Sequence, residues 1–217
     1  MKTRTTYVVG GVRIPFMKSM TAYRDVTTPE LMTASLKSLV ERYNLKGKVV
    51  GDVALGALMQ SSANWNFARE VVQASGLHPN TPAYNVQRAC GTSLETTIQI
   101  AHKISSYQIE SGIAGGVDSN SDLPIMVTRS FSQKLVALNS ARTLGEKLRI
   151  FLSFRPSDLK PVPPAVVEPR TGKSMGEHCE LMVKEWKISR QEQDELALAS
   201  HLNAAKAYKD GFYADLV

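Results

Sequence analysis

The sequence has few cysteines, and the two present, Cys90 and Cys179, lie far apart. Two cysteines in a chain of 217 residues do not make a disulfide framework, and neither has neighbours at the spacing of a metal site. No apolar run is as long as the roughly 18 residues that a transmembrane helix needs. The first six residues also lack the apolar stretch of a secretory signal. We therefore expect reduced thiols, no metal, and a bacterial cytoplasmic or mitochondrial matrix-like location.

The sequence also lacks low-complexity segments and internal repeats. Hydrophobic residues make up 43% of the chain and charged residues 21%, which is typical of a globular protein with a substantial core. The net charge of +6 would suit an anionic ligand or an acidic membrane surface. Because the sign of the charge alone does not distinguish these partners, it leaves both open, and we expect no nucleic-acid partner.

Strand-like and helix-like segments alternate over the first half of the chain. Thr28 is the expected N-cap of the first helix, and Asn66 and Gly76 are expected to begin and end the second. This alternation predicts an α/β fold with βαβ units on a mostly parallel sheet. The expected strands are 7–16, 49–59, 84–86 and 109–117, and the expected helices are 30–43, 67–74 and 90–107.

The pattern changes after residue 118, where a polar loop leads into a mostly helical region. Residues 130–155 form a basic amphipathic stretch, which suits a solvated helix face, a partner-subunit surface or a membrane-surface helix. Two further helices are expected at 175–187 and 190–208, the second with a capping box of Ser189 and Glu192. The sequence thus predicts an α/β core at 1–118 and a helical insertion at 119–217.

Cys90 is the candidate catalytic residue. It follows a short strand and a turn and stands at the start of a helix, where free N–H groups and the helix dipole favour a thiolate nucleophile. Thr92 and Ser93 keep the first helical turn small and polar. The helix is lightly charged, so we expect it to be buried on most sides and Cys90 to be interior. The alternative is that Cys90 is a small buried hydrophobe without a reactive role.

Several segments resemble the N-terminal half of thiolases, and the resemblance covers nearly the whole chain. They are GVRIPF at 11–16, NFAR at 66–69, CGTSLETTIQIA at 90–101, AGGVDSNSDLP at 114–124, and 171–213. The PVPPAVVE segment with the basic stretch before it is most similar to 3-ketoacyl-CoA thiolases of the fatty-acid oxidation, trifunctional-protein beta-subunit type. The resemblance implies a thiolase-like α/β fold of two similar halves. This sequence supplies the first half with much of its helical loop domain, and the second half is absent.

The resemblance implies an acetyl-CoA C-acyltransferase, which acts in lipid metabolism. Such an enzyme cleaves 3-ketoacyl-CoA with coenzyme A into acetyl-CoA and a shortened acyl-CoA, or runs the reverse Claisen condensation. By the same resemblance Cys90 is the nucleophile that becomes acylated, and Ser174 and Met175 border the acyl and pantetheine path. Coenzyme A and acyl-CoA are substrates, and no bound cofactor is expected. Expected partners are a second copy in a homodimer, or a tetramer, a multifunctional β-oxidation subunit, and an anionic membrane surface at 130–155.

The sequence departs from the thiolase pattern in one respect that concerns catalysis. Thiolases complete their site with a His in a Gly-His-Pro motif and a Cys in a Cys-x-Gly motif, and this sequence contains neither motif. We therefore expect the chain alone to be inactive. Two alternatives are a non-catalytic dimerisation or scaffold module with the same fold, and a ketosynthase-like condensing enzyme. The thiolase-like pattern at 171–213 disfavours the second.

Overall fold

The structure is a computed structural model that describes residues 3–60 and 62–216. Its contacts divide the chain into two compact units, Met1–Asp122 with Leu196–Val217, and Leu123–Glu195. The expected division into 1–118 and 119–217 stays a prediction. Met1 and Lys2, at the start of the N-terminus expected to lack a secretory signal, lie outside the described residues. The first unit contains α1 (Thr28–Arg42), β1 (Asp52–Gly56), α2 (Phe67–Ser75), β2 (Ala83–Val86), α3 (Thr92–Ser105) and β3 (Gly112–Gly116).

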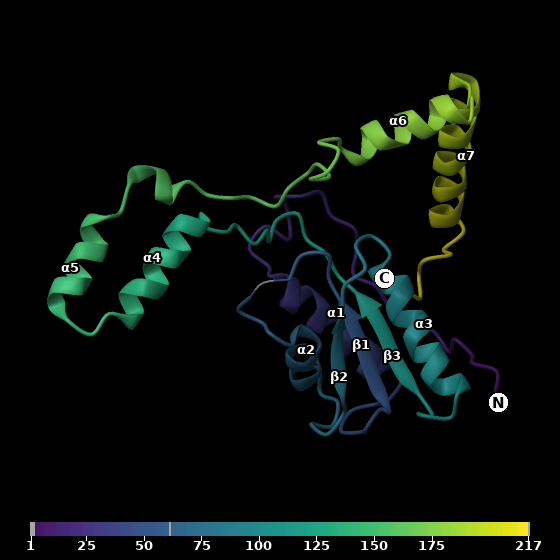
Figure 1. Cartoon of the computed structure of the whole chain (residues 1–217). Helices are drawn as coiled ribbons and strands as arrows, with labels where there is room; N and C mark the ends of the chain where they lie inside the picture. Colours follow the sequence, from purple (N-terminus) through teal and green to yellow (C-terminus); the bar gives the residue numbers. More distant parts are fainter. Residues whose placement is uncertain (1–2, 61, 217) are drawn as a thin grey trace. The chain divides into compact units, whose positions relative to one another are not determined.

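The described strands form a parallel sheet in the order β2-β1-β3 (Figure 1). Gly56 at the end of β1 lies opposite Val86 of β2 and Gly116 of β3. Every residue of β1 is buried, as expected for a central parallel strand covered on both faces. The predicted α/β fold with a parallel sheet is confirmed, although β1 and β3 are shorter than the apolar segments that predicted them.

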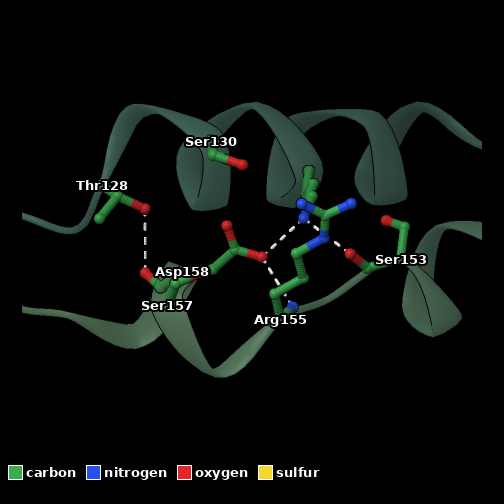
Figure 2. Close-up of a pocket in the computed structure, with 7 residues that line it drawn as sticks. Thr128, Ser130, Ser153, Arg155, Ser157 and Asp158 are labelled. Atoms are coloured by element: carbon green, nitrogen blue, oxygen red, sulfur yellow. Dashed lines mark hydrogen bonds and ion pairs between the residues drawn. The ribbon is translucent and has the colours of Figure 1, made fainter.

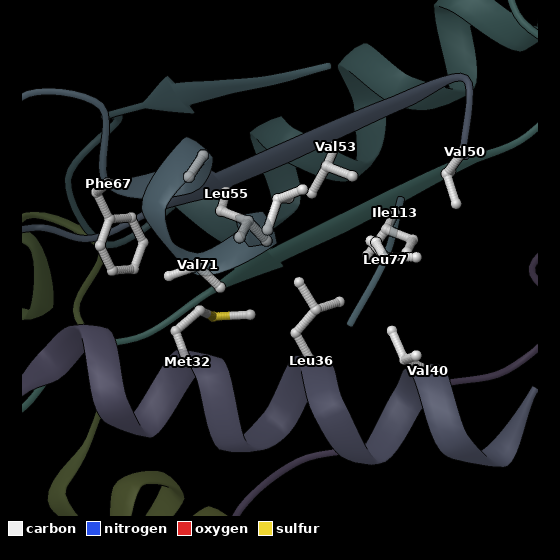
Figure 3. Close-up of a cluster of buried hydrophobic side chains, with 12 residues drawn as sticks. Met32, Leu36, Val40, Val50, Val53, Leu55, Phe67, Val71, Leu77 and Ile113 are labelled. Atoms are coloured by element: carbon white, nitrogen blue, oxygen red, sulfur yellow. The ribbon is translucent and has the colours of Figure 1, made fainter. Parts of the chain in front are cut away.

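Helices cover both faces of this sheet. Val53 and Leu55 point to one face, where they pack with α1 and α2 in the larger hydrophobic cluster (Figure 3). Ala54, between them, points to the other face and packs with Ile100 of α3. This alternation follows from the two-residue period of a strand. The first unit therefore contains a three-layer arrangement, with α1 and α2 on one face of the sheet and α3 on the other.

Local capping signals place the helix ends largely as the sequence predicts. Asn66 caps α2 by accepting the Arg69 amide over 3.0 Å, and Gly76 ends α2 with a φ of +91°. The N-cap of α1 is Thr27, one residue before the predicted Thr28, and it forms a capping box with Glu30. The prediction was one residue late because both threonines can cap and only Thr27 has a glutamate three residues on.

The predicted strand at 7–16 is wrong. No residue of this segment pairs in the sheet, and Tyr7 and Val8 are 78% and 85% exposed. The segment is held at single points instead, for example where the Arg42 guanidinium donates to the Gly11 carbonyl oxygen over 3.0 Å. Strand propensity reflects packing on a pleated, half-buried surface, so apolar β-branched residues without a paired strand do not form one.

The second unit contains α4 (Arg129–Ser140), α5 (Leu144–Leu152), the 3-10 helix η1 (Pro156–Leu159), α6 (Met175–Glu185) and the first residues of α7 (Arg190–Lys209). The predicted helices at 175–187 and 190–208 are confirmed, as is the capping box of Ser189 and Glu192. The basic stretch folds as two helices, α4 and α5. Of the described residues in this unit only Asp158 is buried, so polar contacts, helix caps and the ring contacts of Phe154 with Phe131 and Phe151 hold it rather than a fully buried core.

Candidate functional site

Cys90 lies in a tight turn between the end of β2 and the start of α3, here called the Cys90 turn (residues 87–91). The Gly91 amide donates to the Arg88 carbonyl oxygen over 3.0 Å, and the Thr92 amide donates to that of Ala89 over 3.2 Å. These short-range bonds close the turn from which α3 begins. The predicted order of strand, turn and helix around Cys90 is therefore confirmed.

Cys90 is exposed, and the prediction of an interior site is wrong for this chain. The buried residues of α3 are Thr92, Thr96 and Ile100, four positions apart on one face. Leu94, on another face, is 67% exposed. The light charge of α3 suggested burial on most sides, yet only the face that packs on the sheet is buried, so the thiol at its start is open to solvent.

The helix start beside Cys90 has no side-chain cap. The N-cap of α3 is Gly91, which has no side chain to accept the first-turn N–H groups, and α3 has no side-chain cap bond. Unpaired N–H groups at a helix start favour a negative charge close to them. The start of α3 can therefore stabilise the oxyanion of an attacked carbonyl.

Ala89 in the Cys90 turn and Thr92 directly after it have an arrangement that the sequence pattern does not reveal. Ala89 adopts a φ of +46°, a left-handed conformation that is uncommon for a residue with a Cβ atom. The Thr92 hydroxyl donates to the Ala89 carbonyl oxygen over 2.7 Å and accepts the Arg88 amide over 2.9 Å. The sequence indicates only a small polar residue at position 92, because alanine and threonine carry no signal for a left-handed turn.

Glycines on the neighbouring strands let the start of α3 approach the sheet. A Cβ atom on Gly56 would overlap the Val86 carbonyl oxygen and the Thr92 methyl group. A Cβ atom on Gly116 would overlap the Ser93 hydroxyl. Both glycines stand at the carboxyl ends of their strands, so the sheet directly supports the first turn of α3.

Polar loops follow the same ends of the strands. Asp118 accepts the Leu58 amide over 2.8 Å, which ties the loop after β3 to the loop after β1. Asp122 accepts the Thr28 amide over 2.5 Å at the start of α1. In open α/β sheets ligands bind outside the carboxyl ends of the strands. Cys90 follows β2 and therefore lies beyond the carboxyl ends of the strands, where a ligand site is expected.

The charged side chains nearest in sequence to Cys90 pair with each other. Arg88 forms an ion pair with Glu95 of α3, and Gln99 donates to Glu95 over 2.8 Å. The Gln99 hydrogen bond, followed by that from Arg88, lowers the pKa of Glu95 below its ordinary value. A lowered pKa makes this carboxylate a weaker base, and both of its oxygens already accept hydrogen bonds, so Glu95 is a poor candidate for a general base.

A second cluster lies at the amino end of β1. Lys103 of α3 forms an ion pair with Asp52, and its ammonium group lies 4.2 Å from the centre of the Tyr84 ring. The hydrogen bond that Lys103 donates to Asp52 raises the pKa of Lys103, and burial raises the pKa of Tyr84. Because Lys103 of α3 contacts Asp52 of β1 and Tyr84 of β2, the cluster fastens the far end of α3 to the sheet.

Ser174 and Met175, the expected lining of the acyl path, lie at the start of α6. Ser174 is its N-cap and accepts the Glu177 amide over 3.3 Å in a capping box. Met175 is 75% exposed. Both belong to the second unit, and their role toward an acyl chain stays a prediction.

The second unit has a polar hollow of about 520 Å³ between α4 and η1 (Figure 2). Asp158 accepts from Lys134 over 2.6 Å and from the Arg155 amide over 2.8 Å, and the Thr128 hydroxyl donates to the Asp158 carbonyl oxygen over 2.9 Å. The Lys134 hydrogen bond, followed by that from Arg155, lowers the pKa of Asp158 to about 2. Since these groups satisfy one another, the hollow is the polar joint that holds α4 to η1.

The described part of the chain holds no cluster of three or more His, Cys, Asp or Glu side chains that could bind a metal ion. Among the same residues, no helix combines the length and apolarity that crossing a membrane requires.

Comparisons with known proteins give one consistent result. A family model described as the thiolase N-terminal domain matches residues 6–217. Two similar proteins, both named 3-ketoacyl-CoA thiolase, come from Photorhabdus laumondii subsp. laumondii and Shewanella sp. (strain W3-18-1). They are 41% and 42% identical over 210 residues, and each match covers 97% of this chain and 48% of the relative.

A solved structure extends this similarity to the fold. The acetyl-CoA acetyltransferase of Bacillus anthracis matches with a TM-score of 0.75 at 26% sequence identity. The match covers 95% of this chain and 48% of that protein. The chain thus spans about half the length of each of these proteins.

Proposed function

This chain belongs to the thiolase family, and from that membership we propose that it supplies the nucleophile-bearing half of an acyl-CoA acyltransferase. The reaction is thiolytic cleavage of a 3-ketoacyl-CoA to acetyl-CoA and a shortened acyl-CoA, or the reverse condensation. The observation that supports the proposal best is the exposed thiol of Cys90 at the uncapped start of α3.

In the cleavage direction the Cys90 sulfur attacks the 3-keto carbonyl carbon. The bond between C2 and C3 then breaks, its electron pair stays on the acetyl-CoA carbon, and that carbon takes up a proton. The shortened acyl group is left as a thioester on Cys90, and the thiol of coenzyme A removes it. The intermediate replaces one difficult cleavage by two acyl transfers, and the start of α3, which has no side-chain cap, suits the oxyanion that each attack creates.

The chain needs further residues to complete this chemistry. The family resemblance assigns proton transfer to a His in a Gly-His-Pro motif and to a Cys in a Cys-x-Gly motif, and the 217 residues contain neither. We infer that the chain alone does not turn over and that a complement must supply both groups. Coenzyme A and acyl-CoA then serve as substrates, with no bound cofactor.

The finer assignments are part of the same proposal. Ser174 and Met175 line the acyl and pantetheine path, and a second copy of the chain and a multifunctional β-oxidation subunit are the protein partners. In the basic stretch 130–155, Leu144 and Phe151 are 86% and 62% exposed. That exposure suits a partner subunit or an anionic membrane surface better than a solvated helix face.

A chimaera tests the proposed function. This chain is joined to the part of the Photorhabdus relative that it does not match, and the product is incubated with acetoacetyl-CoA and coenzyme A. We expect turnover. When coenzyme A is left out and the reaction is quenched, we expect one acetyl group on the Cys90 peptide. Cys90→Ser should abolish both, whereas Cys179→Ser, which removes the other exposed thiol, should leave both unchanged. A folded chimaera without turnover or adduct would favour the non-catalytic scaffold.

A further inference from the structure

We propose that Thr92 is a positioning residue for Cys90, because its side chain holds the Cys90 turn in the conformation that presents the thiol at the start of α3. The inference rests on the proposed function only in taking Cys90 as the acyl-accepting nucleophile. Thr92 itself is 4% exposed and lies behind the turn, against the sheet. It acts on the reaction through the backbone of residues 88–90.

The Thr92 hydroxyl joins two backbone groups of the turn. It donates to the Ala89 carbonyl oxygen over 2.7 Å and accepts the Arg88 amide over 2.9 Å. One hydroxyl thus fixes the peptide that links Gln87 to Arg88 and the peptide that links Ala89 to Cys90, which flank Arg88 and Ala89. No other side chain in the described part of the turn makes a hydrogen bond to these two groups.

Ala89 needs such a restraint. Its φ of +46° places the Cβ atom close to the backbone, a conformation that L-residues seldom adopt and that glycine adopts freely. Residues in such conformations persist where the surrounding structure holds them. If Ala89 returned to an ordinary φ, the next residue would point elsewhere, and the next residue is Cys90.

The Thr92 methyl group anchors the same side chain to the sheet. It fills the space beside Gly56 of β1, where a Cβ atom would overlap it. The hydroxyl therefore contacts the turn while the methyl group contacts β1. This division allows the two contacts to be removed separately, since valine keeps the methyl group and loses the hydroxyl, and serine does the reverse.

Alkylation of this chain tests the inference without any need for turnover. The rate of iodoacetamide reaction is measured at Cys90 and at Cys179 by peptide mass spectrometry over a range of pH. Cys179 is exposed and lies on α6, so it serves as an internal reference. In Thr92→Val we expect the Cys90 rate to fall about two- to five-fold relative to Cys179, the range for a charge displaced from a helix start.

Three variants show whether the hydroxyl acts on Cys90 or only on stability. Thr92→Ser should keep the wild-type rate and pH profile. Thr97→Val is the matched control, because the exposed Thr97 hydroxyl also donates to a carbonyl oxygen of α3, that of Ser93, over 2.9 Å. It should leave the Cys90 rate unchanged. The double variant Thr92→Val, Ala89→Gly should regain part of the Cys90 rate that Thr92→Val alone loses, because glycine adopts a positive φ without strain.

The chimaera gives the catalytic consequence. Thr92→Val should lower kcat about 10- to 100-fold with KM little changed, since a displaced nucleophile slows the attack more than it weakens binding. An inactive wild-type chimaera would refute the proposed function and leave the alkylation result standing. A folded Thr92→Val with the wild-type Cys90 rate would overturn the inference. If Thr92→Val does not fold, a ten-fold loss of kcat or of the Cys90 rate in Thr92→Ser would overturn it.

Discussion

Replacing Gly56 with alanine tests whether the sheet directly supports the Cys90 turn. The new Cβ atom would overlap the Val86 carbonyl oxygen and the Thr92 methyl group at once. Neither neighbour can turn away, because one is backbone of β2 and the other is fixed by the hydrogen bonds of Thr92. The strand end and the helix start must therefore both move.

The expected cost follows from three effects. Overpacking a close contact costs about 1–3 kcal/mol, and weakening the bond from the Val117 amide to the Gly56 carbonyl oxygen adds about 0.5–1.5 kcal/mol. The lower entropy of the unfolded chain offsets about 0.4–1 kcal/mol. We expect Gly56→Ala to lower the free energy of unfolding of the first unit by about 0.5–4 kcal/mol.

Urea unfolding combined with hydrogen exchange measures this loss. Exchange of peptides from β1, β2 and α3 reports the first unit by itself, even if the two units unfold separately. Gly11→Ala is the matched control, because a Cβ atom there would have no neighbour within 4 Å. Equal unfolding midpoints for Gly56→Ala and Gly11→Ala, with equal exchange in β1 and α3, would refute the close approach of α3 to the sheet.

Three further perturbations test the core, a cap and the polar joint. Leu36→Ala, at a side chain 1% exposed, should cost about 2–5 kcal/mol in urea unfolding, whereas Leu94→Ala on the exposed face of α3 should cost under about 0.5 kcal/mol; equal costs would contradict the assigned core. Thr27→Ala removes the capping box of α1 and should cost about 0.5–2 kcal/mol, a loss that unchanged exchange in α1 would disprove. The lowered pKa of Asp158, about 2, means that its stabilising effect is complete above the unfolded value near 3.9 and is lost as the pH falls through about 2. Asp158→Asn should abolish this pH dependence in circular dichroism of the second unit, and an unchanged acid transition would show that another group causes it.

The sequence predicts the α/β layout because its signals there are local. Asn66 and Gly76 mark the ends of α2 by chemistry that acts within a few residues, and both were placed correctly. The segment 7–16 was predicted as a strand from propensity alone and failed, because a strand exists only with a partner. Pairing depends on residues distant in the chain, which periodicity does not reveal.

The candidate site shows the same limit more sharply. The sequence placed Cys90 at a helix start, because a strand, a turn and a helix can each be inferred from short patterns. The left-handed Ala89 and the role of Thr92 were not predictable, because neither residue type signals such a turn. The exposure of Cys90 was also mispredicted, since a lightly charged helix shows that a face could be buried and not whether anything covers it.

The Cys90 turn owes its shape to backbone bonds, to Ala89 and to Thr92. Within the described part of the chain the Cys90 thiol itself takes part in no hydrogen bond. The conformation of the turn therefore does not depend on the thiol, and the same backbone would present another small side chain at this place. A selenocysteine could replace Cys90, or a spectroscopic probe could be linked to its exposed thiol, without breaking a hydrogen bond of the turn, and this helix start would then carry chemistry that the natural residue does not provide.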